Sequence, residues 1–328
     1  MLQYILRRVL LMIPTVFAIS IVVFIIIQLP PGDFLTTLVA TMSSQGETVD
    51  QQALDALRQQ YGIGQPVYVQ YYKWMKNILL HGDFGRSFEY NQPVTSLIGT
   101  RLALTVVISL ASLMLTWLIA FPIGIFSAVR KYSAGDYVFT LISFIGLAIP
   151  EFLLALVLMY VSFKYLNQSV GGLFSPQYVD APLSLGKVLD LFKHMWIPAV
   201  IIGAAHTAGL VRIMRANLLD ELNKPYVVTA RAKGLEERRL LLKYPVRLAL
   251  NPFVSTVGWI LPGILSGEAI IGIVLSLPTE GPLLLHALES QDMYLAGSLL
   301  FFITILTVLG TLVSDIILAW LDPRIRYT

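Results

Sequence analysis

The sequence predicts an all-α integral membrane protein with six transmembrane helices. Of its 328 residues, 56% are hydrophobic and 13% are charged, and the mean hydropathy is +0.73. Soluble domains are about 45–50% apolar, so one soluble core could not cover this much apolar surface. Helices cross the bilayer because they satisfy every backbone hydrogen bond internally. Six segments are long and apolar enough to do so, approximately residues 9–29, 102–129, 137–163, 194–213, 253–275 and 298–321.

The charges flanking these spans predict the orientation. The first span follows two arginines and has only a weak cleavage pattern near Ala18, so residues 1–30 are expected to be a retained signal anchor. Lys and Arg near span ends are held in the cytoplasm. An N-in, C-in arrangement places fifteen of the 23 basic residues inside and is favoured over its inverse. These are Arg7, Arg8, Arg130, Lys131, Arg212, Arg215, Lys224, Arg231, Lys233, Arg238, Arg239, Lys243, Arg247, Arg324 and Arg326.

Residues 31–100 are expected to form a small extracytoplasmic helical insertion after the first span. Two helices are predicted, over residues 50–62 and 66–82, and each ends at a glycine. The following segment, HGDFGRSF, is a glycine-broken turn in which Asp83 can accept hydrogen bonds from the backbone or from Arg86. The insertion is either a cap packed on the spans, which the spacing alone favours, or a docking surface for a soluble partner.

Two other external segments are predicted. Residues 164–193, which contain GGLFSP and several prolines, form a loop outside the membrane. The segment LPTEGPLLLHALESQDMY after the fifth span is expected to lie as an amphipathic piece at the outer interface.

Ionisable residues within the predicted spans need a reason, because a central charge costs about 2.5–3.5 kcal/mol on insertion scales. Glu151 follows Pro150 near the middle of the third span, where the proline predicts a kink. For Glu151 and Glu268, a place along a polar translocation path explains the charge as well as hydrogen bonding between helices does. For His206 and Asp315, hydrogen bonding between helices is the favoured explanation, although His206 stays a candidate path residue.

The motif inventory argues against an enzyme. The chain has no H-E-x-x-H, no G-x-S-x-G, no dinucleotide fingerprint and no G-x-x-x-x-G-K-[ST]. It has no cysteine, which excludes thiol catalysis, and its four scattered histidines do not suggest a metal centre. We therefore expect no catalytic residue, no metal and no cofactor on this chain. A pump of this sequence would take its energy from an ion gradient or from a separate subunit.

A cytoplasmic loop over residues 214–252 is predicted to be far longer than a connector requires. Within it, residues 229–244 have the sequence TARAKGLEERRLLLKY, in which seven of sixteen residues are charged. Their composition predicts a helix over residues 226–233, a left-handed turn at Gly234 and a second helix over residues 236–243. On physical grounds alone, this hairpin either meets another protein or lies on anionic lipid.

The segment YVVTARAKGLEERRLL resembles the signature loop of permeases of binding-protein-dependent ABC importers, in their dipeptide and oligopeptide branch. The segments ILRRVLLMIPTVFAIS, GQPVYVQYYKW with HGDFGRSF, IPEF and LDPRIRY match the same family in the same order. The resemblance implies a type I ABC importer fold, in which residues 101–328 form the permease core. It also implies that residues 226–242 contain a coupling helix that binds in a groove of an ATPase subunit. The implied coupling residues are Tyr226, Thr229, Ala230, Arg231, Ala232, Lys233, Gly234, Leu235 and Glu236.

The partners implied by the resemblance are a second homologous permease subunit, two cytoplasmic ATPase subunits that bind ATP and Mg²⁺, and an extracytoplasmic solute-binding protein. The location implied is the prokaryotic cytoplasmic membrane, with lipid around the spans and no nucleic-acid partner. Asp83 and Arg86 are then candidate docking residues, and Glu151, His206 and Glu268 are candidate path residues. Peptides or peptide-like solutes are the expected cargo, with nickel, glutathione, opines and oligosaccharides as alternatives. A secondary transporter or channel, and a structural or signalling anchor, are the rival classes.

Two departures from the family pattern carry their own expectations. Tyr244 and Pro245 stand where many relatives have His-Ala, and the proline predicts that the second helix of the loop is broken or redirected. In the fifth span the acid is Glu268, whereas the commoner pattern has it at the place of Gly272. Four residues shift the carboxylate by about 6 Å along one helix face, so a substrate contact cannot simply be carried over.

Overall fold

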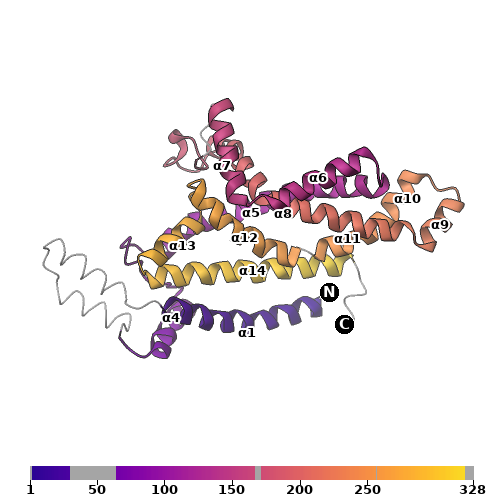
Figure 1. The fold of residues 1–328 in the computed structure, drawn as a ribbon. Coiled ribbons are helices and arrows are strands. Elements are labelled where there is room, and N and C mark those ends of the chain that lie inside the picture. The colour runs from indigo at the N-terminus through magenta and orange to yellow at the C-terminus, as the bar shows by residue number, and fades with distance from the viewer. Residues whose placement is uncertain (1, 30–63, 167–170, 256, 322–328) are drawn as a thin grey trace. The chain divides into compact units, whose positions relative to one another are not determined.

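The computed structural model describes residues 2–29, 64–166, 171–255 and 257–321. These residues form helices and no β-strand, and an isolated antiparallel bridge joins Arg86 to Pro93. The α-helices (Figure 1) are α1 (Leu2–Ile27), α4 (Val67–His81), α5 (Val94–Val129), α6 (Ala134–Ala148), α7 (Glu151–Val161), α8 (Leu185–Leu222), α9 (Pro225–Ala232), α10 (Glu237–Lys243), α11 (Pro245–Ser255), α12 (Val257–Val274), α13 (Glu280–Glu289) and α14 (Met293–Leu321).

The helices belong to two compact units. The first unit comprises Met1–Arg7, Thr105–Pro278 and Leu309–Thr328, and the second comprises Arg8–Leu104 and Thr279–Val308. The predicted boundaries of the signal anchor, the insertion and the permease core stay a prediction.

Four helices of the described residues are long and apolar enough to cross a membrane, and they coincide with the first, second, fourth and sixth predicted spans. They cover Gln3–Ile27, Val94–Val129, Leu185–Leu222 and Met293–Ile317. Each is longer than its predicted span at one end or at both, because hydropathy locates only the apolar part of a helix whose backbone bonding continues into the polar flanks.

The largest difference from the prediction concerns the fourth span. Helix α8 begins after Ser184, whose hydroxyl accepts a hydrogen bond from the backbone N–H of Lys187 at 3.2 Å. Residues 185–193, which were predicted as the last part of an external loop, are therefore helical. Residues 214–222 are likewise helical, so α8 extends into the segment predicted as the cytoplasmic loop, and the bounds 214–252 of that loop stay a prediction.

The third predicted span is two helices and not one. Helices α6 and α7 are separated by Ile149 and Pro150 and make an angle of 104°, so they count as a single span only if the bent pair is taken together. The kink predicted at Pro150 is confirmed, and it is sharp enough to divide the predicted span into two helices. Proline lacks the N–H that would bond back into α6, and it disfavours helical backbone at the residue before it.

In the first unit, α5 and α8 approach closely because small residues lie between them. The Thr116 hydroxyl donates to the carbonyl of Gly203 at 3.3 Å. A Cβ atom added at Gly124 would lie 2.6 Å from the Cβ of Met214. Such small residues are the usual means by which membrane helices reach van der Waals contact. Helix α12 covers most of the fifth predicted span and also packs against α8.

The second unit is organised around aromatic side chains of α1, α4 and α14. The Trp74 ring lies 5.5 Å from that of Phe24 and 5.9 Å from that of Phe301. Helix α4 begins after Pro66 and ends at Gly82 with a φ of +63°, as predicted for the second helix of the insertion. The first predicted helix, residues 50–62, lies outside the described residues. Buried around Trp74 are Phe24, Ile27, Met75, Val94, Ile98, Leu283, Ala287, Leu295, Ala296, Leu299 and Phe301.

Candidate functional site

The charged loop forms the predicted helix–turn–helix. Helices α9 and α10 are joined by a turn in which Gly234 has a φ of +77°, a conformation that costs a side-chain-bearing residue energy. Val227 of α9 and Leu240 of α10 are fully buried, and the two helices contact each other. Helix α10 ends at Lys243 and Pro245 opens α11, so the break predicted from the proline is confirmed. This pair of short helices is called the hairpin below.

The hairpin presents most of the predicted coupling residues to its surroundings. Tyr226, Ala230 and Leu235 are partly buried. Exposed are Thr229, Arg231, Ala232, Lys233, Gly234 and Glu236. The small and polar residues of the motif thus form an accessible surface of this unit.

Two polar contacts stiffen the hairpin and its attachment. Arg231 donates to the Glu237 carboxylate at 2.6 and 3.1 Å, which joins α9 to α10. This hydrogen bond holds the pKa of Glu237 below its ordinary value. The Tyr226 hydroxyl donates to Glu221 at 2.5 Å, which joins α9 to the end of α8. Burial and then this bond raise the pKa of Tyr226, so it stays a neutral donor.

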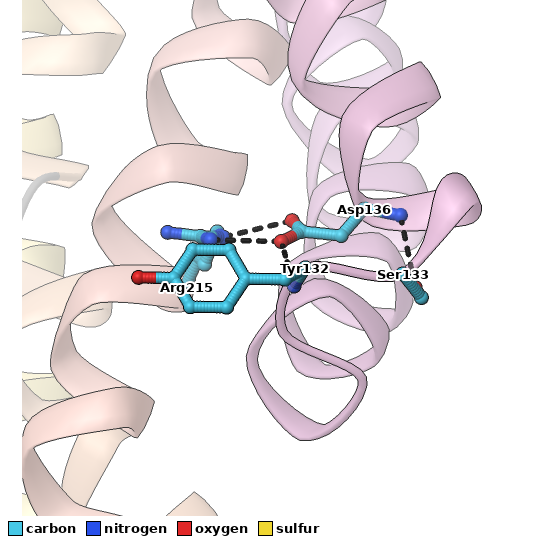
Figure 2. A network of polar contacts seen from close by, with 4 residues as sticks. All are labelled: Tyr132, Ser133, Asp136 and Arg215. Atoms are coloured by element: carbon cyan, nitrogen blue, oxygen red, sulfur yellow. Dashed lines mark hydrogen bonds and ion pairs between the residues drawn. The ribbon is translucent and has the colours of Figure 1, made fainter.

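A second polar cluster joins α6 to α8 and was not predicted (Figure 2). Arg215 donates from Nε and Nη2 to the two oxygens of Asp136, at 2.9 and 2.8 Å. Asp136 also accepts from the backbone N–H of Tyr132 at 2.9 Å, and its own N–H donates to Ser133 Oγ at 3.2 Å. The side chain of Asp136 is 3% exposed and that of Arg215 is 27% exposed. The sequence carried one signal for the cluster, the helix-opening pattern Ser133-x-x-Asp136, which does not identify the arginine.

The candidate path residues lie on three helices of the first unit. His206 of α8 lines a groove, and Glu151 is the first residue of α7, which packs against α8. Its Nδ1 is 3.2 Å from the carbonyl of Ile202. Glu268 is fully buried in α12. The groove has a volume of about 610 Å³ and is lined by Leu147, Ala205, His206, Gly209, Arg212, Ile213, Ala216 and Ile260.

The candidate docking residues lie on the turn after α4 and are exposed. Asp83 accepts from the backbone N–H of Gly85 at 2.8 Å, so the predicted backbone bond is confirmed. Arg86 instead donates to the carbonyl of Asn91, at 2.7 and 3.1 Å. Gly85 has a φ of +91°, and a Cβ there would come within 2.8 Å of the Tyr294 ring.

Asp292, which the sequence did not single out as a functional residue, fixes the conformation of this turn by accepting hydrogen bonds from it. The carboxylate is fully buried and accepts from Ser87 Oγ at 2.6 Å, from the N–H of Glu89 at 3.2 Å and from the N–H of Leu295 at 3.1 Å. The last bond caps α14, and an aspartate directly before an apolar helix was the available signal. Burial raises the pKa of Asp292, and the hydrogen bonds that its carboxylate accepts only partly oppose that rise.

The raised pKa of Asp292 predicts a dependence of stability on pH. Its contribution to stability is fully present below the ordinary pKa of 3.8 and is lost as the pH rises through the higher pKa of the folded state. We expect the stability of the native protein, relative to that of Asp292→Asn, to fall over this window by up to about 1.4 kcal/mol per pH unit. Thermal unfolding of both proteins between pH 3 and 7 measures the difference. Parallel curves would contradict the assignment.

Comparison with known proteins is in accord with this geometry. Residues 120–327 match the family model described as the inner membrane component of binding-protein-dependent transport systems, and residues 1–111 match the model of its N-terminal part. The chain is 36% identical over 328 residues to the oligopeptide transport system permease protein AppB of Bacillus subtilis, with all of both chains covered. It is 31% identical over 327 residues to the glutathione transport system permease protein GsiC of Escherichia coli, again with full coverage of both.

The matched family model covers both the hairpin and the bent pair α6–α7. Relatives above 30% identity match the chain over its full length. Both findings agree with the resemblance found in the charged loop. The chain therefore belongs to the inner membrane components of binding-protein-dependent transport systems, and it is a permease subunit of an ABC importer of the bacterial inner membrane.

Proposed function

We propose that this permease subunit imports peptides or peptide-like solutes, and that the hairpin couples it to a separate ATPase. The observation that carries the proposal is the hairpin itself, an exposed pair of helices joined to the long helix α8 by only Asn223 and Lys224. A partner that moves α9 must also move the end of α8, because so short a link leaves little freedom.

The proposed topology is six spans with both termini in the cytoplasm and an extracytoplasmic insertion over residues 31–100. The four long helices and the bent pair provide five spans. We assign the sixth to α12, whose 18 residues rise about 27 Å, close to the hydrocarbon thickness of about 30 Å. The basic residues near the span ends support the orientation.

The proposed assembly contains a second homologous permease subunit, two ATPase subunits that bind ATP and Mg²⁺, and a solute-binding protein. The absence of a phosphate-binding loop from the sequence supports a separate ATPase, and no cofactor is assigned to this chain. The exposed turn with Asp83 and Arg86 is the proposed docking surface for the binding protein. Glu151, His206 and Glu268 are the proposed path residues, and the three helices that carry them pack against one another.

The proposed solute follows from the relatives. AppB is an oligopeptide permease, and GsiC is a permease for glutathione, which is itself a short peptide-like solute. A short peptide of a few residues is a solute consistent with the names of both relatives. Nickel, opines and oligosaccharides are the alternatives that a transport assay must separate.

Cysteine cross-linking tests the coupling, because the native chain has no cysteine. Ala232 is exposed on α9, so Ala232→Cys should form a nucleotide-sensitive cross-link with the ATPase subunit in membranes. Leu141 is 61% exposed on α6, and Leu141→Cys is the matched control that should form none. Equal labelling of both variants by lipid-soluble reagents, with no ATPase adduct at Ala232→Cys, would contradict coupling through the hairpin.

Uptake in proteoliposomes tests the solute. With the binding protein, both permeases and the ATPase reconstituted, we expect ATP-dependent uptake of labelled short peptides. Uptake of nickel or oligosaccharide with no uptake of peptides would refute the proposed cargo.

A further inference from the structure

The hairpin is connected firmly to one end of α8. Only Asn223 and Lys224 lie between α8 and α9, and the Tyr226–Glu221 hydrogen bond of 2.5 Å closes this corner. Helices α10 and α11 complete the connection, since α10 packs on α11 and α11 packs along α8. We therefore expect the end of α8 to move together with α9 when α9 is displaced.

Helix α6 lies antiparallel along α8 in the same unit (Figure 1). At one end of the contact Asp136 meets Arg215 through two hydrogen bonds. Further along, Arg212 lies over the Phe144 ring at 5.6 Å from its centroid. Near the other end, Gly146 faces Ala208, and a Cβ added at the glycine would be only 3.7 Å from that residue's Cβ.

These three contacts differ in stiffness. The glycine contact is ordinary packing, and a cation over a ring tolerates sliding. The bidentate contact of a planar guanidinium with a carboxylate fixes both distance and direction. The backbone N–H of Tyr132 also donates to the Asp136 carboxylate, whereas the Ser133 hydroxyl accepts from the backbone N–H of Asp136 and so caps α6 (Figure 2). Of the three contacts, the ion pair therefore restricts sliding and rotation of α6 on α8 most strongly.

We propose that the Asp136–Arg215 pair is a positioning contact of the transport cycle, which makes α6 move with α8 and so carries the displacement of the hairpin to the bend at Pro150. The inference rests on the proposed coupling through the hairpin. Helix α6 ends directly before the bend, and Glu151 begins α7, which packs against the helix α8 that carries His206. Rotation of α6 together with α8 thus changes the positions of both Glu151 and His206. If α6 could slide on α8, the bend at Pro150 would not move with α8.

The chemistry of the pair suggests a variant that separates positioning from stability. Removing one partner leaves a charge in a largely buried place, which destabilises a protein strongly, whereas removing both charges is often tolerated. Asp136→Asn/Arg215→Met removes both charges and the bidentate bond. The amide oxygen of Asn at position 136 still can accept from the N–H of Tyr132, so the local turn is preserved.

The experiment measures transport per ATP hydrolysed, with the complete importer reconstituted in proteoliposomes. In the double variant, we expect the ATPase subunits to assemble and hydrolyse ATP within about twofold of the native rate, while uptake per ATP falls about tenfold. The matched control is Ser133→Ala, which weakens the cap of α6 but keeps the ion pair. Its uptake per ATP should stay within about twofold of the native value.

Two results would overturn the inference. The first is native uptake per ATP in the double variant, and the second is an equal loss in Ser133→Ala, which would reduce the pair to a stabiliser of α6. Failure of the proposed coupling is visible separately, because Ala232→Cys would then form no adduct with the ATPase subunit. Arg215→Lys is a third variant, which keeps the positive charge but loses the planar guanidinium and its two parallel hydrogen bonds. We expect its uptake per ATP to lie between those of the native protein and the double variant.

Discussion

Replacing Asp292 by alanine is expected to lower the free energy of unfolding of the second unit by about 3 kcal/mol. The carboxylate is buried and accepts from Ser87, Glu89 and Leu295. Each buried donor left without a partner costs about 1–3 kcal/mol, and water entering the site recovers part of that. Thermal unfolding of the purified protein measures the loss, and hydrogen exchange at the N–H groups of Glu89 and Leu295 locates it.

Asp292→Asn is the matched control, since its amide keeps one acceptor oxygen in the same volume. We expect it to lose about 1 kcal/mol, with exchange increased at only one of the two N–H groups. Unchanged exchange in Asp292→Ala would mean that the turn after α4 is held by other contacts. The consequence for transport follows from the same bonds, because this carboxylate fixes the turn that carries Asp83 and Arg86.

Gly124→Val is expected to be the most damaging substitution in the first unit. A Cβ at this position would lie 2.6 Å from the Cβ of Met214 and 3.2 Å from the carbonyl oxygen of Val211. Neither atom is the free end of a flexible side chain, so α5 and α8 must separate. Overpacking of this kind costs about 1–3 kcal/mol, and valine adds two further methyl groups to the clash. The yield of folded protein and its unfolding temperature are the measurements.

Helix α5 offers its own control in Gly99, where an added Cβ meets no atom within 4 Å. Gly99→Ala should leave the unfolding temperature unchanged or raise it slightly, since alanine is the better helix former by about 1 kcal/mol. Gly124→Ala should fall between the control and Gly124→Val. A Gly124→Val protein as stable as Gly99→Ala would show that the two helices can part without cost.

The sequence was sufficient wherever a local rule decides the structure. Gly234 requires a left-handed turn, Pro245 starts a helix more easily than it continues one, and Gly82 ends α4, so the hairpin and the second helix of the insertion were predictable. Pro150 predicted the position of the bend but not its angle, which depends on what α7 packs against.

Contacts between distant residues were beyond the same rules. Asp136 and Arg215 are 79 positions apart, and Ser87 and Asp292 are 205 positions apart. In the sequence, each aspartate is an ordinary residue at the start of a helix, and the neighbouring residues do not predict its distant partner. The ends of α8 were missed for another reason, because hydropathy marks where a helix is apolar and not where its hydrogen bonding stops.

The bend between α6 and α7 has a consequence for what surrounds it. Helix α6 has 15 residues and rises about 22 Å, less than the hydrocarbon layer is thick. In the proposed topology the bend therefore lies within this layer, where non-helical backbone is tolerated only if protein or water satisfies its carbonyl groups. Hydration is therefore expected to follow the chain to Pro150, and a polar solute passing there would exchange part of its water shell for carbonyl oxygens without ever facing bare hydrocarbon.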